Sequence, residues 1–191
     1  GCRGTLAGHC RVGLGLIGGL SLCATMEGDW HIDLSAGKPA AYAALRQAVS
    51  ALLTGESNRT ANLANAAAAL FATFGWHWVG FYLVDAVRDE LVLGPFQGPV
   101  ACTRLRKGKG VCAAAWEKAE LVNVPDVEAF PGHVACSSLS KSEIVIPVVV
   151  DGLVVAVLDI DAAAFGAFDA VDEAGLAAMV SDLESMWMTW E

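Results

Sequence analysis

The segment 143–161, EIVIPVVVDGLVVAVLDID, contains the strongest indication of the fold. Two apolar runs, residues 143–150 and 153–160, stand on either side of the dipeptide Asp151-Gly152. An Asp-Gly pair between apolar runs is typical of a tight turn that joins two antiparallel strands. The segment therefore predicts a β-hairpin.

The segments around this hairpin predict one α+β domain. Helical patterns cover residues 40–53, 58–74, 111–118 and 171–187. Short β-rich runs cover residues 77–84, 90–93, 101–105 and 121–124. No internal repeat or linker divides the chain, and helices before and after such strands are typical of an antiparallel sheet between helical layers.

The composition excludes several classes of protein. The chain has 191 residues, a formal net charge of −9 and 55% hydrophobic residues, which is too apolar for an intrinsically disordered chain. It lacks the clustered positive charge that phosphate binding requires, so no nucleic-acid partner is expected. No run of about 18 apolar residues is present, so no membrane partner is expected. We expect a soluble, cytoplasmic protein with a small-molecule or protein partner.

Residues 1–25 differ from the rest of the chain. They contain arginine but no acidic residue, and the apolar stretch 12–22 is about as long as the hydrophobic region of a signal peptide. The GxGxxG pattern at 13–18 follows no predicted strand, so it does not indicate a dinucleotide site. Two explanations stay open: an organelle-targeting segment, or a natural start at Met26. In both we expect a disordered leader over 1–25 and a folded domain over 26–191.

Three carboxylates mark the ends of the predicted hairpin strands. Asp159 and Asp161 lie on one face because side chains alternate along a strand. A two-residue loop would place Glu143 opposite Ile160, on the other face, whereas a three-residue loop with a left-handed Gly152 would place it opposite Asp159. The acids either form a costly cluster that a ligand compensates, or simply reach water at the strand ends.

Three cysteines lie in the body of the chain, at positions 102, 112 and 136. No CxxC motif occurs and their spacing matches no common zinc site, so no metal is expected. Cys136 lies in a predicted loop, 131–140, where an accessible thiol can act as a nucleophile. Either Cys102 or Cys112 could approach Cys136 in the fold. Two interpretations stay open: the three cysteines are inert core thiols, or Cys136 forms a sulfenic acid that condenses with one of the others to a disulfide.

Several motifs, in one order, are similar to the GAF-domain free methionine-(R)-sulfoxide reductases. The resemblance covers about residues 40–184 and includes all three body cysteines. It rests on the segments WVGFYL (78–83), LGPFQG (93–98), AC (101–102), GKGVC (108–112), GHVAC (132–136), SEIVIP (142–147) and VLDID (157–161), with GE (55–56) and ANLAN (61–65) in the helical region.

The resemblance implies a fold and an activity. The fold is a single GAF domain, with a six-stranded antiparallel sheet flanked by N- and C-terminal helices. The activity is reduction of free L-methionine-(R)-sulfoxide, in which Cys136 attacks the sulfoxide sulfur and Cys112 resolves the intermediate as a disulfide. Cys102 would be a further redox-active thiol. No bound cofactor is implied, and thioredoxin, recharged by NADPH, would return the enzyme to its dithiol form.

The resemblance also assigns substrate-binding residues. Glu143, Asp159 and Asp161 would bind the ammonium group and polarise or protonate the sulfoxide oxygen. Trp78 and Tyr82 would wall the pocket around the S-methyl group. The alternative function is a non-catalytic GAF module that senses a small molecule or dimerises, and because terminal GAF helices often pair, a homodimer is a further expectation.

Overall fold

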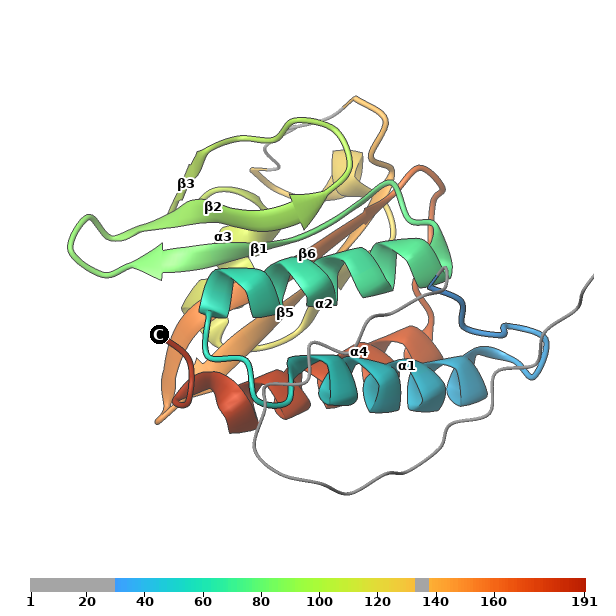
Figure 1. The fold of residues 1–191 in the computed structure, drawn as a ribbon. Coiled ribbons are helices and arrows are strands. Elements are labelled where there is room, and N and C mark those ends of the chain that lie inside the picture. Colours follow the sequence, from blue (N-terminus) through green and yellow to red (C-terminus); the bar gives the residue numbers. More distant parts are fainter. Residues whose placement is uncertain (1–29, 133–137) are drawn as a thin grey trace, which may run out of the picture.

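A computed structural model describes residues 30–132 and 138–191. It contains a six-stranded antiparallel sheet with helices on both faces (Figure 1), which confirms the expected α+β class. The leader over 1–25 and the loop cysteine Cys136 lie outside the described residues. The division of the chain at residue 25 therefore stays a prediction.

The elements follow the order expected from the sequence. The α-helices are α1 (Lys38–Leu53), α2 (Arg59–Phe74), α3 (Gly110–Lys118) and α4 (Ala170–Trp187), with a short 3₁₀ helix, η1 (Val127–Ala129). The strands are β1 (Trp78–Asp85), β2 (Glu90–Gln97), β3 (Arg104–Arg106), β4 (Val122–Val124), β5 (Ser142–Val150) and β6 (Leu153–Ala162). They are arranged in the order β3-β2-β1-β6-β5-β4, so the hairpin β5–β6 lies inside the sheet.

Strand β2 is longer than its sequence indicated. The expected strand stopped at residue 93 because Gly94 and Pro95 usually end a strand. In the structure β2 continues to Gln97 by pairing with β1, across an irregularity between Gly80 and Tyr82. Proline is tolerated because the ladder with β3 spans only residues 90–92, so Pro95 lies beyond that pairing.

The two faces of the sheet bury different side chains. Helices α1, α2 and α4 cover one face, and α3 lies on the other (Figure 1). Ile144, Leu158 and Ile160 are completely buried against the three-helix layer, where each stabilises the fold by about 1.5–3 kcal/mol. Val145 and Val157, one position out of phase, pack on the α3 side. The α3 face is therefore the one that Glu143, Asp159 and Asp161 share.

A bulge sets the register of the hairpin. The turn has two residues, Asp151 and Gly152, both with positive φ (51° and 77°), as a tight hairpin turn requires. The register shifts by one residue between Val148 and Val149. Both expected pairings of Glu143 are therefore wrong: it pairs with Asp161, neither with Ile160 nor with Asp159. The bulge nonetheless puts all three acids on one face, as the longer loop would have done.

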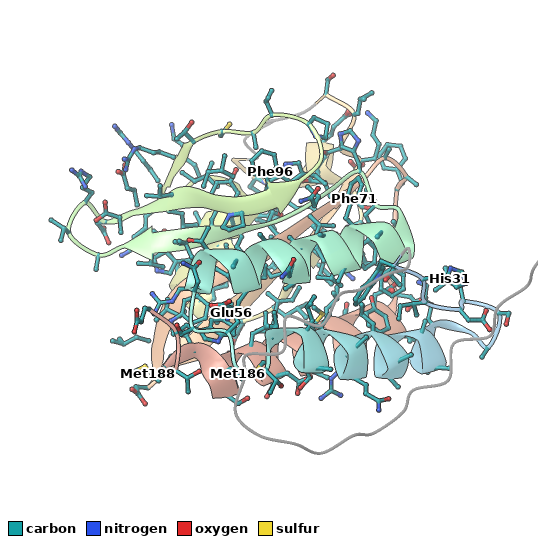
Figure 2. All side chains as sticks on the ribbon, in the orientation of Figure 1. His31, Glu56, Phe71, Phe96, Met186 and Met188 are labelled. Carbon is teal, nitrogen blue, oxygen red and sulfur yellow. The ribbon has the colours of Figure 1, made fainter. Side chains whose placement is uncertain are left out.

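A missing side chain on β1 makes room for an indole ring. Trp78 lies nearly parallel to Phe96 of β2, with ring centroids 5.3 Å apart. Phe96 is labelled in Figure 2. Gly80 lies under this stack, and a Cβ atom there would be 2.4 Å from Phe96 Cβ and 2.5 Å from Trp78 Cη2. Both distances are far below van der Waals contact, so only glycine allows Trp78 to cross the strand.

Replacing Gly80 with alanine tests this packing. Alanine usually stabilises a strand relative to glycine by about 0.5–1 kcal/mol, because glycine loses more conformational entropy on folding. Here the clash should reverse the sign and lower the free energy of unfolding by about 1–3 kcal/mol. Denaturant unfolding measures the change, and near-ultraviolet circular dichroism reports the displacement of Trp78. Equal or higher stability of Gly80→Ala would show that the indole moves aside without cost.

Candidate active site

A cavity lies between the α3 face of the sheet and the start of α3. Six of the site residues expected from the sequence line it: Trp78, Tyr82, Cys112, Glu143, Asp159 and Asp161. The rest of the lining comes from the loop before β3, from β3 itself, from the N-cap and first turn of α3 and from the segment before β5: Pro99, Val100, Ala101, Leu105, Lys109, Gly110, Val111 and Ser140. Cys102 does not line the cavity, and Cys136 lies outside the described residues.

The sheet register brings the acids together. Asp161 of β6 pairs with Glu143 on one side and with Trp78 of β1 on the other. Asp159, two residues earlier on β6, pairs with Gly80 and therefore lies on the same face. Two neighbouring strands, β5 and β6, thus bring three carboxylates together beside Trp78 of β1.

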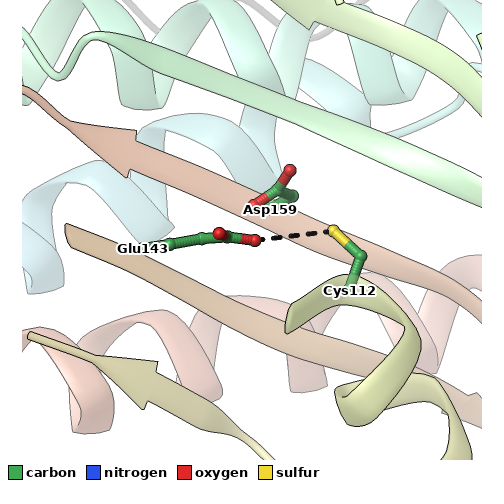
Figure 3. Close-up of side chains that lie close together, drawn as sticks. All are labelled: Cys112, Glu143 and Asp159. Atoms are coloured by element: carbon green, nitrogen blue, oxygen red, sulfur yellow. Dashed lines mark hydrogen bonds between the residues drawn. The ribbon is translucent and has the colours of Figure 1, made fainter. Parts of the chain in front are cut away.

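Helix α3 adds a thiol to these carboxylates. Cys112 lies in the first turn of α3, and its Sγ is 3.9 Å from Glu143 Oε1, with Asp159 beside the pair (Figure 3). One ligand atom from each of the three residues lies within 4.8 Å of the others. The family resemblance placed all three residues in one site, but no spacing in the sequence predicts their contact, because they come from α3, β5 and β6.

The acids are buried close to one another, and this raises their pKa values. Glu143 and Asp159 are only 7% and 6% exposed. Burial raises the pKa of Glu143 well above its ordinary value, and the charges of Asp159 and Asp161 raise it further. Burial also raises the pKa of Asp159, and the charge of Asp161 raises it further. Asp159 Oδ1 is buried without a hydrogen-bond partner among the described residues, so it is available to a ligand.

The two described cysteines are in different states. Cys112 is a free, buried thiol. Its burial raises its pKa well above the ordinary value, and the charges of Asp159 and Glu143 raise it further. A thiol that keeps its proton is a weak nucleophile. Cys102 is disulfide-bonded. The resolving role of Cys112 therefore stays a prediction.

The aromatic wall is tied to the loop that carries Cys102. Trp78 and Tyr82 stack with ring centroids 5.9 Å apart. The Trp78 indole donates a hydrogen bond to the Pro99 carbonyl (3.1 Å), and the Tyr82 hydroxyl donates one to the Cys102 carbonyl (3.0 Å). Burial and the charge of Asp159 raise the pKa of Tyr82, so it remains a donor. The two rings therefore hold the loop 99–102 over the cavity.

Sequence reasoning missed this loop and one basic residue. Pro99, Val100 and Ala101 line the cavity because Trp78 and Tyr82 hold their backbone, and no spacing in the sequence reveals that contact. Lys109, immediately before α3, brings a positive charge to the lining. A Gly/Lys stretch before a predicted helix was the available signal. The cavity therefore presents acids, a basic residue, an apolar wall and a thiol to a small zwitterionic molecule.

No helix within residues 30–132 and 138–191 has both the length and the apolar character needed to cross a membrane.

Comparisons with known proteins agree with the sequence motifs. A family model described as a GAF domain matches residues 57–187. GAF domain-containing protein A of Dictyostelium discoideum is 52% identical over 81% of this chain and 98% of its own length. Free methionine-R-sulfoxide reductase of Escherichia coli is 44% identical over 78% of this chain and 89% of its own.

A solved structure extends the likeness to the whole described domain. The free methionine-R-sulfoxide reductase of Neisseria meningitidis, crystallised in complex with its substrate, is 47% identical and superimposes with a TM-score of 0.81. The match covers 84% of this chain and 96% of that one. The fold, the motifs and the family model lead to one assignment: the chain belongs to the GAF-domain family.

Proposed function

We propose that this chain is an oxidoreductase that reduces free L-methionine-(R)-sulfoxide to L-methionine. The observation that carries the proposal is the cavity, in which a free thiol, three carboxylates and two aromatic rings meet. Relatives named for this activity, at 44% identity in Escherichia coli and 42% in Saccharomyces cerevisiae, support it. A sensor function draws no comparable support, because a bound signal would not require the disulfide-bonded Cys102, whose carbonyl accepts a hydrogen bond from the cavity residue Tyr82.

The charges of the cavity suit a free amino acid. Glu143, Asp159 and Asp161 would bind the ammonium group, and Lys109 supplies a positive charge for the carboxylate. Peptide linkage removes both substrate charges, so a peptide-bound methionine sulfoxide would lose these contacts. Trp78 and Tyr82 would hold the S-methyl group, since sulfur-containing methyl groups pack well against aromatic rings. The charged residues would therefore select the free amino acid, and the two aromatic rings would position its sulfur.

The chemistry needs a nucleophile and a source of protons. In the proposed cycle the Cys136 thiolate attacks the sulfoxide sulfur, and the oxygen takes up a proton. The sulfoxide S–O bond breaks and the oxygen passes to the Cys136 sulfur, so that methionine leaves and Cys136 becomes a sulfenic acid. Burial and the neighbouring carboxylates raise the pKa values of Glu143 and Asp159 and so favour their protonated forms, which suits them to act as general acids.

A second thiol closes the cycle. It displaces the sulfenic oxygen as water, so that one sulfoxide and two thiols yield methionine, a disulfide and water. We propose that Cys102 is the main partner of Cys136, because Cys102 is disulfide-bonded whereas Cys112 is a free thiol. Thioredoxin would then reduce the disulfide by exchange, drawing on NADPH through its own reductase. A homodimer and a cytoplasmic location stay predictions.

The activity is tested by NADPH oxidation in the presence of thioredoxin and thioredoxin reductase. We expect turnover with free methionine-(R)-sulfoxide, little with the (S) epimer, and little with peptide-bound sulfoxide. Cys136→Ser should abolish turnover, because it removes the attacking sulfur. Full thioredoxin-coupled turnover by this variant, or equal rates with free and peptide-bound substrate, would overturn the proposal.

Cysteine variants separate the two candidate resolving thiols. In Cys102→Ser we expect one equivalent of methionine from a first turnover, followed by a steady-state rate lower by about tenfold or more, because intramolecular attack on the sulfenic acid is lost. Cys112→Ser should retain the disulfide and most of the steady-state rate. Rapid-quench assays and mass spectrometry of the trapped cysteines measure both. The opposite pattern would return the resolving role to Cys112.

Asp159→Asn should stabilise the substrate-free protein while it reduces activity. The raised pKa means that Asp159 contributes most to stability below its unfolded pKa, about 4, and that this contribution is lost as the pH rises through the folded pKa. Asparagine mimics the protonated acid, so at pH 8 we expect a gain of about 1 kcal/mol, or about 2–4 °C in Tm. Wild-type Tm should also fall more steeply between pH 5 and 9 than that of the variant.

A surface variant serves as the matched control for this measurement. Asp182 forms an ion pair with Arg46 at 2.7 Å and is about one-third exposed. Asp182→Asn should leave the pH slope of Tm unchanged and lower stability slightly, if at all. A Tm for Asp159→Asn below that of the wild type at pH 8 would contradict the burial argument.

A further inference from the structure

Three buried side chains at the end of the cavity form a set of potential metal ligands. Cys112 Sγ and one carboxylate oxygen each from Glu143 and Asp159 lie within 4.8 Å of one another (Figure 3). All three residues are more than nine-tenths buried. Among the described residues, no other group of His, Cys, Asp and Glu has this geometry.

A second observation concerns one oxygen of the Asp159 carboxylate. Asp159 Oδ1 is buried, lies on the cavity side of β6 and accepts no hydrogen bond from the described residues. A buried carboxylate oxygen without a partner is costly, because nothing replaces the water that it loses on folding. A bound cation would compensate for that loss.

The separation of the thiol from the Glu143 carboxylate is close to that of two ligands on a small tetrahedral ion. Zinc takes sulfur at about 2.3 Å and carboxylate oxygen at about 2.0–2.2 Å, which places ligand atoms about 3.4–3.6 Å apart in a tetrahedron. The distance from Cys112 Sγ to Glu143 Oε1 is 3.9 Å. A change of a few tenths of an ångström would therefore bring these two ligands into position.

The ligand types distinguish between metals. Calcium and magnesium require six or more oxygen ligands, which three side chains including a thiol do not provide. One sulfur and two carboxylates, with a fourth position open to the cavity, suit zinc. The buried acids also supply negative charge that a divalent ion would neutralise. The chemistry of the set selects a borderline-soft divalent cation.

We propose that the reduced protein binds one Zn²⁺ ion through Cys112, Glu143 and Asp159, and that the ion excludes the amino-acid substrate from the cavity. Binding would displace the protons of the thiol and of the two carboxylic acids to the solvent, with no change in oxidation state. Glu143 and Asp159 would be occupied by the metal, so they could not bind an ammonium group. This second part of the inference rests on the proposed function, whereas metal binding itself does not.

The test measures zinc affinity by competition with a chromophoric chelator under reducing conditions. All proteins carry serine at Cys2, Cys10 and Cys23, so that leader thiols do not contribute. The reference is the Cys102→Ser/Cys136→Ser variant, which retains Cys112 and forms no disulfide. It should bind one equivalent of zinc. Adding Cys112→Ser should weaken binding by more than about 100-fold, because loss of even an outer-shell partner costs about 10–100-fold.

Cobalt provides a spectroscopic check on the same proteins. Co²⁺ in the reference variant should show a thiolate-to-cobalt charge-transfer band, and Cys112→Ser should abolish it. Glu143→Gln and Asp159→Asn should each weaken binding, while Asp182→Asn, a surface control, should not. Circular dichroism and Tm verify that each variant is folded. Zinc binding that survives Cys112→Ser, or that requires Cys102 or Cys136, would overturn the assignment.

Competition with substrate separates this inference from the proposed function. The reference variant lacks the attacking thiol, so free methionine-(R)-sulfoxide acts on it as a plain competitor and should weaken zinc binding. Turnover of the wild type is measured separately with a chelator present. Zinc binding without competition would overturn the exclusion of substrate. Turnover without Cys112-dependent zinc binding would overturn the metal site alone, and zinc binding without turnover would overturn the proposed function alone.

Discussion

The bulge between Val148 and Val149 is the constraint on which the cavity depends. Side chains alternate along a strand, so a shift of one residue exchanges the two faces of β5. Without the bulge the tight turn would direct Glu143 towards the three-helix layer, among side chains such as Ile144 that are completely buried. A carboxylate there would have no polar surroundings. The one additional residue in the hairpin therefore decides whether Glu143 lies in the acidic cavity or destabilises the apolar core.

The cavity concentrates groups that oppose folding. Like charges and burial act together on Glu143 and Asp159, and both raise the energy of the ionised forms. Most of the apolar core lies on the other side of the sheet, where α1, α2 and α4 pack. This core supplies the stability that the acids reduce. The properties that make the acids proton donors, or ligands for a cation, are the same ones that make them unfavourable in the empty cavity.

The sequence predicted the elements well and the contacts between them less well. Local signals, such as the Asp151-Gly152 turn and the stripe of α4, depend on neighbouring residues and are visible in the chain. The length of β2 and the pairing of Glu143 depend on irregularities between strands, which leave no local pattern. The family motifs identified Trp78, Tyr82, the acids and a redox-active Cys102, but not Lys109. The positions of Lys109 and Cys102 depend on loops that distant side chains hold.

The Tyr82 hydroxyl donates a hydrogen bond to the Cys102 carbonyl and so links the wall of the cavity to the backbone of a disulfide-bonded residue. The ring forms part of the wall on which a ligand would rest, and the carbonyl belongs to the residue whose sulfur is oxidised. A movement of that backbone on reduction would lengthen or redirect the hydrogen bond and tilt the ring. Through this one hydrogen bond, a change in the oxidation state of Cys102 would alter the shape of the cavity.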